Sequence, residues 1–202
     1  MTFNKKAIDT FWISEMGMTL REYGDRDVGE TFSNALTFVD KGMVPSEIMT
    51  KSVKRVDIDL YEGVGIIRDI SKGNGPTLLF DCGIYAVCHD ATLPVGIESG
   101  SFVMMRFYLL FDVGYFGSLR MNGKRLSDVI PEMWYDWKIK DILIEIEDEI
   151  GRKNFENLPV AYTSSKGAIY KRITGTNVDE DCGEDFNTSY VLVCEMLQHA
   201  DR

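Results

Sequence analysis

The sequence predicts a single α+β domain spanning residues 1–202. Apolar runs alternate with turn residues between positions 53 and 126, which predicts an antiparallel meander sheet of about five or six strands. Apolar residues at helical spacing predict an N-terminal helix over about 5–16 and a second helix near 131–150. There is no internal repeat, low-complexity tract or linker, so a sheet packed with these two helices is the simplest expectation.

The N-terminal helix is predicted from an apolar stripe that Gly17 interrupts, formed by Ile8, Phe11, Trp12, Ile13 and Met16. The segment 25–30 has the composition of a loop. A short helix is expected over 31–40, because Gly42 supplies a stop and Pro45 opens a further turn.

The meander is predicted from alternation and turn signals. Val56, Ile58 and Leu60 alternate with two aspartates, which is the pattern of a half-buried strand. Further strands are expected over Val64–Ile70, Thr77–Cys88 and Phe102–Asp112, of which the last is aromatic-rich and long enough for a central strand, with Tyr115–Met121 continuing it. Asn122-Gly123 is the strongest two-residue hairpin signal in the chain.

The helix near 131–150 is predicted to begin at Pro131 and to end at Gly151. Its apolar residues follow at spacings of three, one, three and four: Ile139, Ile142, Leu143, Ile146 and Ile150. Ile142, Ile144 and Ile146 also alternate, so a strand remains the alternative.

Composition indicates an ordinary folded protein, with 202 residues, 45% hydrophobic and 27% charged. No window approaches 18 uncharged apolar residues, and the N-terminus lacks the unbroken apolar run of a signal peptide. We therefore expect a cytoplasmic protein whose cysteines stay reduced. Cys82, Cys88 and Cys194 lie in apolar, strand-like runs, as small buried side chains do.

The net charge of −10, from 22 bases and 32 acids, limits the plausible partners. Such a field disfavours direct binding of nucleic acid through its phosphates, and it disfavours anionic membrane surfaces for the same reason. It favours a basic protein partner, because complementary fields raise the rate of encounter.

Two clusters of acids contain no base. The first is Asp141, Glu145, Glu147, Asp148 and Glu149, and the second is Asp179, Glu180, Asp181, Glu184 and Asp185. On the predicted helix, Glu145, Asp148 and Glu149 share the outer face near the C-terminal end, where like charges repel and the helix dipole disfavours anions. A use for that charge is one explanation, and it makes the first cluster the better candidate for a contact surface.

Aromatic side chains crowd the start of the same helix. Trp134, Tyr135 and Trp137 cannot all face one core, so at least one is expected near the surface, where it would anchor a partner; an aromatic-rich core is the alternative. The predicted partner-binding residues are therefore Trp134, Tyr135, Trp137, Glu145, Asp148, Glu149, Asp179, Glu180, Asp181 and Asp185.

Candidates for catalysis or metal binding are few. Cys88, His89 and Asp90 could form a nucleophile–base arrangement only if a strand ends between the first two, since neighbours on a strand point to opposite faces. A zinc site is disfavoured because the gap between Cys82 and Cys88 is longer than the usual spacing of zinc ligands, and no second close pair of Cys or His residues exists to complete the site. The acidic loop 177–185 fails both EF-hand registers, and no phosphate-binding loop is present, so we predict no metal and no cofactor.

These observations favour a small acidic binding protein that neutralises or regulates a basic protein partner, in the manner of an immunity protein or an inhibitor. One alternative is a small enzyme with a Cys/His centre at Cys88 and His89. Another is a structural or assembly subunit in which Phe102–Asp112 pairs at an exposed edge.

Overall fold

The computed structural model describes residues 10–17, 19–20, 24–69, 77–88, 93–112, 120–121, 124–125, 131–146, 155–177, 179 and 188–197. The secondary structure of this part of the chain is nearly all β. Its elements are β1 (Thr10–Met16), β2 (Thr31–Pro45), β3 (Ser52–Arg55), β4 (Leu60–Asp69), β5 (Leu78–Asp81), β6 (Tyr85–Cys88), β7 (Phe102–Asp112), β8 (Arg120–Met121), β9 (Lys124–Arg125), the 3-10 turn η1 (Pro131–Met133), β10 (Tyr135–Glu145), β11 (Val160–Thr163), β12 (Ile169–Ile173) and β13 (Ser189–Leu197).

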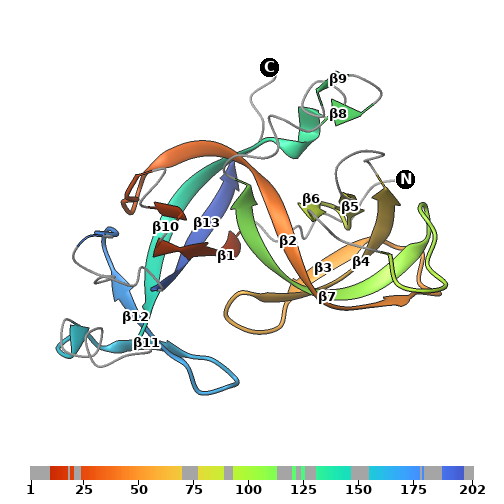
Figure 1. The fold of residues 1–202 in the computed structure, drawn as a ribbon. Coiled ribbons are helices and arrows are strands. Elements are labelled where there is room, and N and C mark those ends of the chain that lie inside the picture. The colour runs from red at the N-terminus through yellow and green to blue at the C-terminus, as the bar shows by residue number, and fades with distance from the viewer. Residues whose placement is uncertain are drawn as a thin grey trace.

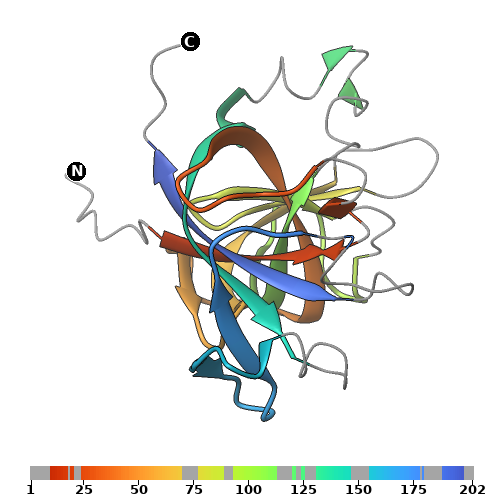
Figure 2. The ribbon, with the colours of Figure 1, turned by 90° about the vertical axis from the view of Figure 1, so that its left-hand side faces the viewer.

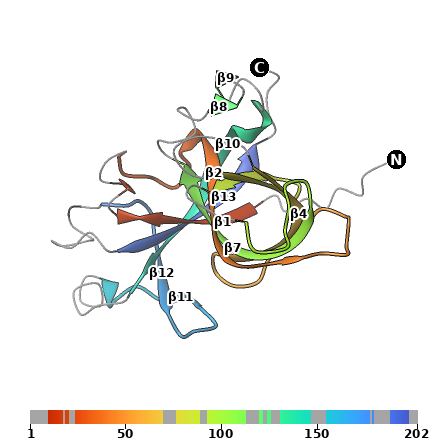
Figure 3. The same ribbon diagram turned by 45° about the vertical axis from the view of Figure 1, so that its right-hand side comes forward.

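Eleven of these strands form one mixed sheet that closes on itself twice (Figure 1). The long antiparallel pair β2–β7 is common to both closures. The first ring runs from β7 through β1, β13 and β10 back to β2. The second ring runs from β7 through β4, β5 and β6 back to β2. Figure 2 shows the face on which β1, β13 and β10 lie side by side, and Figure 3 looks toward the second ring, where β7 curves around to β4.

The two rings share one hydrophobic core. Alternate residues of β7 are buried along its whole length, which places the same face of that strand inside both rings: Val103, Met105, Phe107, Leu109 and Phe111. Phe11 of β1 joins the two halves, because its ring lies 5.8 Å from that of Trp137 in the first ring and 6.2 Å from that of Tyr61 in the second.

The second ring closes over a glycine. A Cβ atom on Gly65 of β4 would lie 2.4 Å from the carbonyl oxygen of Asp81. That contact is to backbone, which cannot move aside as a flexible side chain can, so β4 and the end of β5 can approach this closely only at a glycine.

The predicted α+β class is therefore wrong: the described residues form a β-sheet without either expected helix. Residues 10–16 are β1, with Phe11 and Ile13 buried on one face. On the other face, the Trp12 ring packs on that of Tyr162 at 5.6 Å. Because both faces of the strand carry packed apolar groups, the residues resemble a helical stripe in sequence.

The helix predicted near 131–150 is also wrong, since its described residues, 131–146, contain η1 followed by β10. A register shift between Ile139 and Asp141 marks a β-bulge. Inward residues precede it at 135, 137 and 139 and follow it at 142, 144 and 146. The bulge thus turns a two-residue alternation into a three-residue step, which produced the helical spacing.

The helix predicted over 31–40 is the first part of β2. Gly42 does not stop a helix; it lies at φ 139° within a register shift between Asp40 and Met43, so it marks a bulge in β2. Residues 56–59 form the turn between β3 and β4 and not a strand.

Of the other predicted strands, Val64–Ile70 lies in β4 up to Asp69, and Thr77–Cys88 is divided into β5 and β6. Most of Tyr115–Met121 lies outside the described residues. β7 has the predicted bounds and is central, pairing with β2 on one side and with β4 and β1 on the other. It therefore offers no exposed edge, which removes the assembly hypothesis in the form stated. Met121 pairs with Lys124, as the predicted two-residue hairpin requires. Within the residues described, we find no helix with the length and hydropathy that a membrane crossing needs.

Candidate functional site

The predicted aromatic anchors lie mainly in the core. Trp137 is fully buried and donates a hydrogen bond from Nε1 to the Asn34 carbonyl oxygen at 3.1 Å. Tyr135 is also buried, and its hydroxyl accepts a bond from the Tyr85 N–H at 2.6 Å. Trp134 is half-buried against a small apolar cluster that includes Met133. Tyr135 and Trp137 thus stabilise the fold, and neither can reach a partner in this structure.

The first acidic cluster does not form an outer helix face, because its described residues lie on β10. Asp141 pairs with Arg172 of the neighbouring strand, at 2.6 Å between carboxylate oxygen and Nε. Glu145 is half-buried at the end of β10, opposite Tyr170. Asp148 and Glu149 lie outside the described residues. A base from β12 therefore pairs with Asp141, although no base lies within the cluster in sequence. The first acidic cluster is consequently a weaker candidate for a contact surface than its sequence indicated.

Two of the three cysteines that the structure describes are buried, and the third is half-buried. Cys82, Cys88 and Cys194 are not joined in disulfides. Burial raises the pKa of the Cys82 thiol to about 12 and also raises the pKa of Cys194, which keeps both thiols protonated. Cys88 is half-buried at the last position of β6, while His89 and Asp90 lie outside the described residues. Among those that are described, no three His, Cys, Asp or Glu side chains converge as metal ligands would.

The segment just before the second acidic cluster contacts residues 25–30, which the sequence predicts as a loop. Asp179 is exposed, and Glu180, Asp181 and Asp185 lie outside the described residues. Just before this cluster, Gly175 forms an isolated antiparallel bridge with Asp27. We call residues 25–30 the contact loop.

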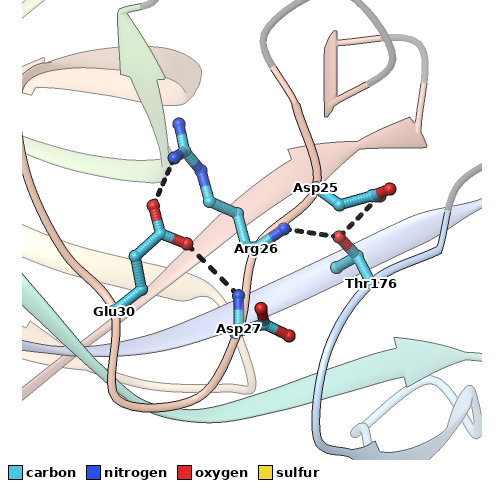
Figure 4. Close-up of polar contacts among 5 residues, drawn as sticks. All are labelled: Asp25, Arg26, Asp27, Glu30 and Thr176. Carbon is cyan, nitrogen blue, oxygen red and sulfur yellow. Dashed lines mark hydrogen bonds and ion pairs between the residues drawn. The ribbon is translucent and has the colours of Figure 1, made fainter.

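Thr176 fastens the contact loop to the chain leading into the second cluster (Figure 4). The Thr176 hydroxyl accepts a hydrogen bond from the Arg26 N–H at 2.8 Å and donates one to Asp25 Oδ1 at 2.9 Å. The Thr176 N–H also donates to the Arg26 carbonyl oxygen at 2.8 Å. The contact loop is thereby fastened to a residue about 150 positions away in sequence, which precedes Asp179 by three residues.

The contact loop is held in a defined shape by backbone bonds. The Glu30 N–H donates to the Asp27 carbonyl at 3.1 Å, closing a β-turn in which Gly29 takes a φ of 94°. The Val28 and Gly29 N–H groups donate to the carbonyls of Thr174 and of β10. A loop that already has a defined shape loses little conformational entropy when it binds another molecule.

Within the contact loop, the single base is turned toward its neighbours. The Arg26 guanidinium donates to Glu30 Oε1 at 2.6 Å and lies 4.7 Å from the centre of the Phe32 ring, and only 18% of its side chain is exposed. Asp25 and Asp27 are exposed. The contact loop therefore carries three acids and one largely covered base.

β1 carries a buried carboxyl group. Glu15 of β1 is 5% exposed and faces into the first ring. Burial raises the pKa of Glu15 to about 8, against the opposing effect of the nearby Arg26 charge. Glu15 is consequently protonated at neutral pH.

A separate polar cluster joins the β3–β4 turn to its surroundings. The Asp57 carboxylate accepts hydrogen bonds from the N–H and hydroxyl of Ser165, and Asp59 accepts one from the Ser14 hydroxyl. The Arg55 guanidinium lies 3.8 Å from the centre of the Trp12 ring. These contacts hold β1 and the β11–β12 turn against the second ring, which is a structural role.

One weak signal for the contact loop is visible in the sequence, namely three acids within the six residues from Asp25 to Glu30. Nothing in local sequence indicates that Thr176 would lie beside it. Comparisons of this chain with protein-family models, curated proteins and solved structures yield no match.

Proposed function

We propose that this protein binds a basic protein partner, neutralising or regulating it as an immunity protein or inhibitor does, through the contact loop and the acidic segment that follows Thr176. The observation that carries the proposal is the fastening of Asp25 and Arg26 to Thr176, which joins two acidic segments distant in sequence. Asp179 follows Thr176 by three residues, so its Cα lies within about 11 Å of that of Thr176.

Electrostatics support a protein partner. Charges within about one Debye length, roughly 8–10 Å at physiological salt, add to a common local field. A concentrated anionic field of this kind speeds the approach of a cationic surface and repels phosphate-bearing molecules. Direct nucleic-acid binding and attachment to anionic membranes stay disfavoured on the same ground, and a cytoplasmic setting remains part of the proposal.

The test begins with capture of partners from the native source on the immobilised protein and their identification by mass. The dissociation constant of the purified partner is then measured by calorimetry at low and at physiological salt. The double charge reversal D25K/D27K is expected to weaken binding at low salt at least tenfold, which corresponds to about 1.4 kcal/mol.

The matched control is E47K/E98K, which changes the net charge equally at two exposed glutamates outside the contact loop. We expect this control to change the dissociation constant less than threefold. Equal losses in the two variants would mean that only overall charge matters. Unchanged affinity in D25K/D27K would remove the contact loop from the interface.

A further inference from the structure

We propose that the outer face of β2, β7 and β4 binds a segment of another protein in which carboxylates lie between apolar side chains. β7 lies between the other two strands, and its outward residues alternate with its buried ones (Figure 1). Three of the outward residues are Met104, Arg106 and Tyr108. Binding at this face is independent of the proposed function, because the contact loop is bonded to Ile139 of β10 and contributes no residue to it.

Two rows of apolar side chains cross the outer face. In one row, Val39 of β2 lies opposite Tyr108, and in the other, Val44 of β2 lies opposite Met104. Val39, Val44 and Met104 are 42%, 48% and 41% exposed, and Tyr108 is half-buried. Four positions along β7 separate the rows, which is about 14 Å. Neighbouring exposed apolar side chains of this kind mark sites of interaction.

A row of charged side chains lies between the two apolar rows. Arg106 is bonded to Glu62 of β4 at 3.2 Å, and Lys54 of β3 is bonded to the same carboxylate at 2.7 Å. The side chains of the two bases are 62% and 67% exposed, whereas that of Glu62 is 22% exposed. The positive groups are therefore the more accessible ones. Lys41 adds a third base on this face, since its Nζ lies 5.2 Å from the centre of the Tyr108 ring.

The bases between the apolar rows outnumber the acids among the described residues. One carboxylate, that of Glu62, serves both Arg106 and Lys54. The next acid along β2, Asp40, accepts a hydrogen bond from the Gly42 N–H at 2.7 Å within the bulge. Even with Asp40 included, this row is positive in a chain whose net charge is −10. Complementarity therefore favours a partner that brings carboxylates to it.

The combination of apolar and basic side chains selects the occupant. Methionine, arginine and tyrosine are enriched at protein–protein interfaces, and here they occupy successive outward positions of β7. A basic segment would meet Arg106 and Lys41 as like charges. A second copy that docked through the same face would also place bases against bases. An acidic segment with apolar neighbours satisfies the charged row and both apolar rows.

The experiment selects peptides from a displayed random library on the immobilised full chain. We expect the selected peptides to combine aliphatic or aromatic residues with Asp or Glu. The dissociation constant of the strongest peptide is then measured by calorimetry. The charge reversal K41E/R106E should weaken binding at least about tenfold, and M104S should weaken it about fivefold.

Matched controls change residues of the first ring. K140E/R172E alters the net charge equally at two exposed, ion-paired bases, and V160S truncates an exposed apolar side chain. Each control should change the dissociation constant less than about twofold. Because Lys41 forms no ion pair among the described residues, K41E alone tests the outer face if the double variant does not fold.

Selected peptides that are basic overturn the proposal, and so does a library that yields no binder. Equal losses in K41E/R106E and K140E/R172E would refute it as well, since the peptides would then sense only overall charge. A dimer seen by analytical ultracentrifugation and lost in M104S would assign the outer face to a second copy instead. The variant D25K/D27K should still bind the selected peptides, which separates this result from the proposed function.

Discussion

Replacing Glu15 with glutamine should stabilise the protein, and the gain should grow with pH. The folded state holds the Glu15 side chain at 5% exposure, where ionisation is unfavourable, whereas the unfolded chain leaves it in water. Burial raises the pKa in the folded state from 4.5 to about 8. Glutamine fills nearly the same volume and never ionises.

The sign and size of the effect follow from proton linkage. Below pH 4.5 both states are protonated, so the carboxyl imposes no pH-dependent penalty. Between the two pKa values, 4.5 and about 8, the unfolded state has lost a proton that the folded state keeps, and the free energy of unfolding falls by about 1.4 kcal/mol per pH unit. At pH 7 the wild type should thus be about 3 kcal/mol less stable than it would be without this ionisation.

The assay is urea unfolding of wild type and E15Q at half-unit steps from pH 4.5 to pH 8.5, followed by tryptophan fluorescence. The difference in unfolding free energy should rise through this range and level off above pH 8, whatever constant offset the amide introduces. The control E98Q changes an exposed glutamate, and its difference from wild type should stay flat. A flat difference for E15Q as well would refute a raised pKa at this site.

Three further outcomes are expected. Gly65→Ala should destabilise the protein by at least about 2 kcal/mol in urea unfolding, because the added Cβ meets the Asp81 carbonyl oxygen. Tyr61→Phe should cost about 1–2 kcal/mol in the same assay, because the Trp12 N–H donates to the Tyr61 hydroxyl at 2.7 Å and would lose its acceptor. Mild alkylation of the folded protein, read by mass, should modify Cys88 before the two buried thiols.

Each outcome has an internal comparison. Gly63→Ala on the same strand meets its nearest atoms at 3.0 and 3.1 Å, so it should cost less than Gly65→Ala; the reverse order would contradict the closure argument. Tyr108→Phe, on the outer face of β7, should leave the free energy of unfolding nearly unchanged. Complete resistance of Cys88 would count against a Cys/His enzyme, whereas unusually fast modification would favour one.

The β7 strand could be predicted because one face is buried and the other is not, so its alternation is visible in sequence. β10 could not, because a bulge after Ile139 and a second buried face at Leu143 together reproduce helical spacing. The N-terminal strand was hidden in the same way, by Trp12 packing on a residue 150 positions away. In both strands, tertiary packing decides the fold and local periodicity does not.

The candidate site was predictable only in its chemistry. Net charge and the acidic segment at Asp179 indicated a basic partner, and these come from sequence alone. The proposed place of contact depends on Thr176 reaching Asp25 and Arg26 across the fold, which no local pattern encodes. The aromatic residues misled for the opposite reason, since Trp137 is needed in a core that both rings share.

The most direct test of the acidic contact surface is hydrogen exchange of the protein with and without its captured partner. The proposal predicts that the partner slows exchange in peptides covering the contact loop and residues 174–177, while peptides from β3 and the chain at 93–101 are unchanged. Protection confined to those other segments, with the contact loop exchanging at its unbound rate, would contradict the proposed function.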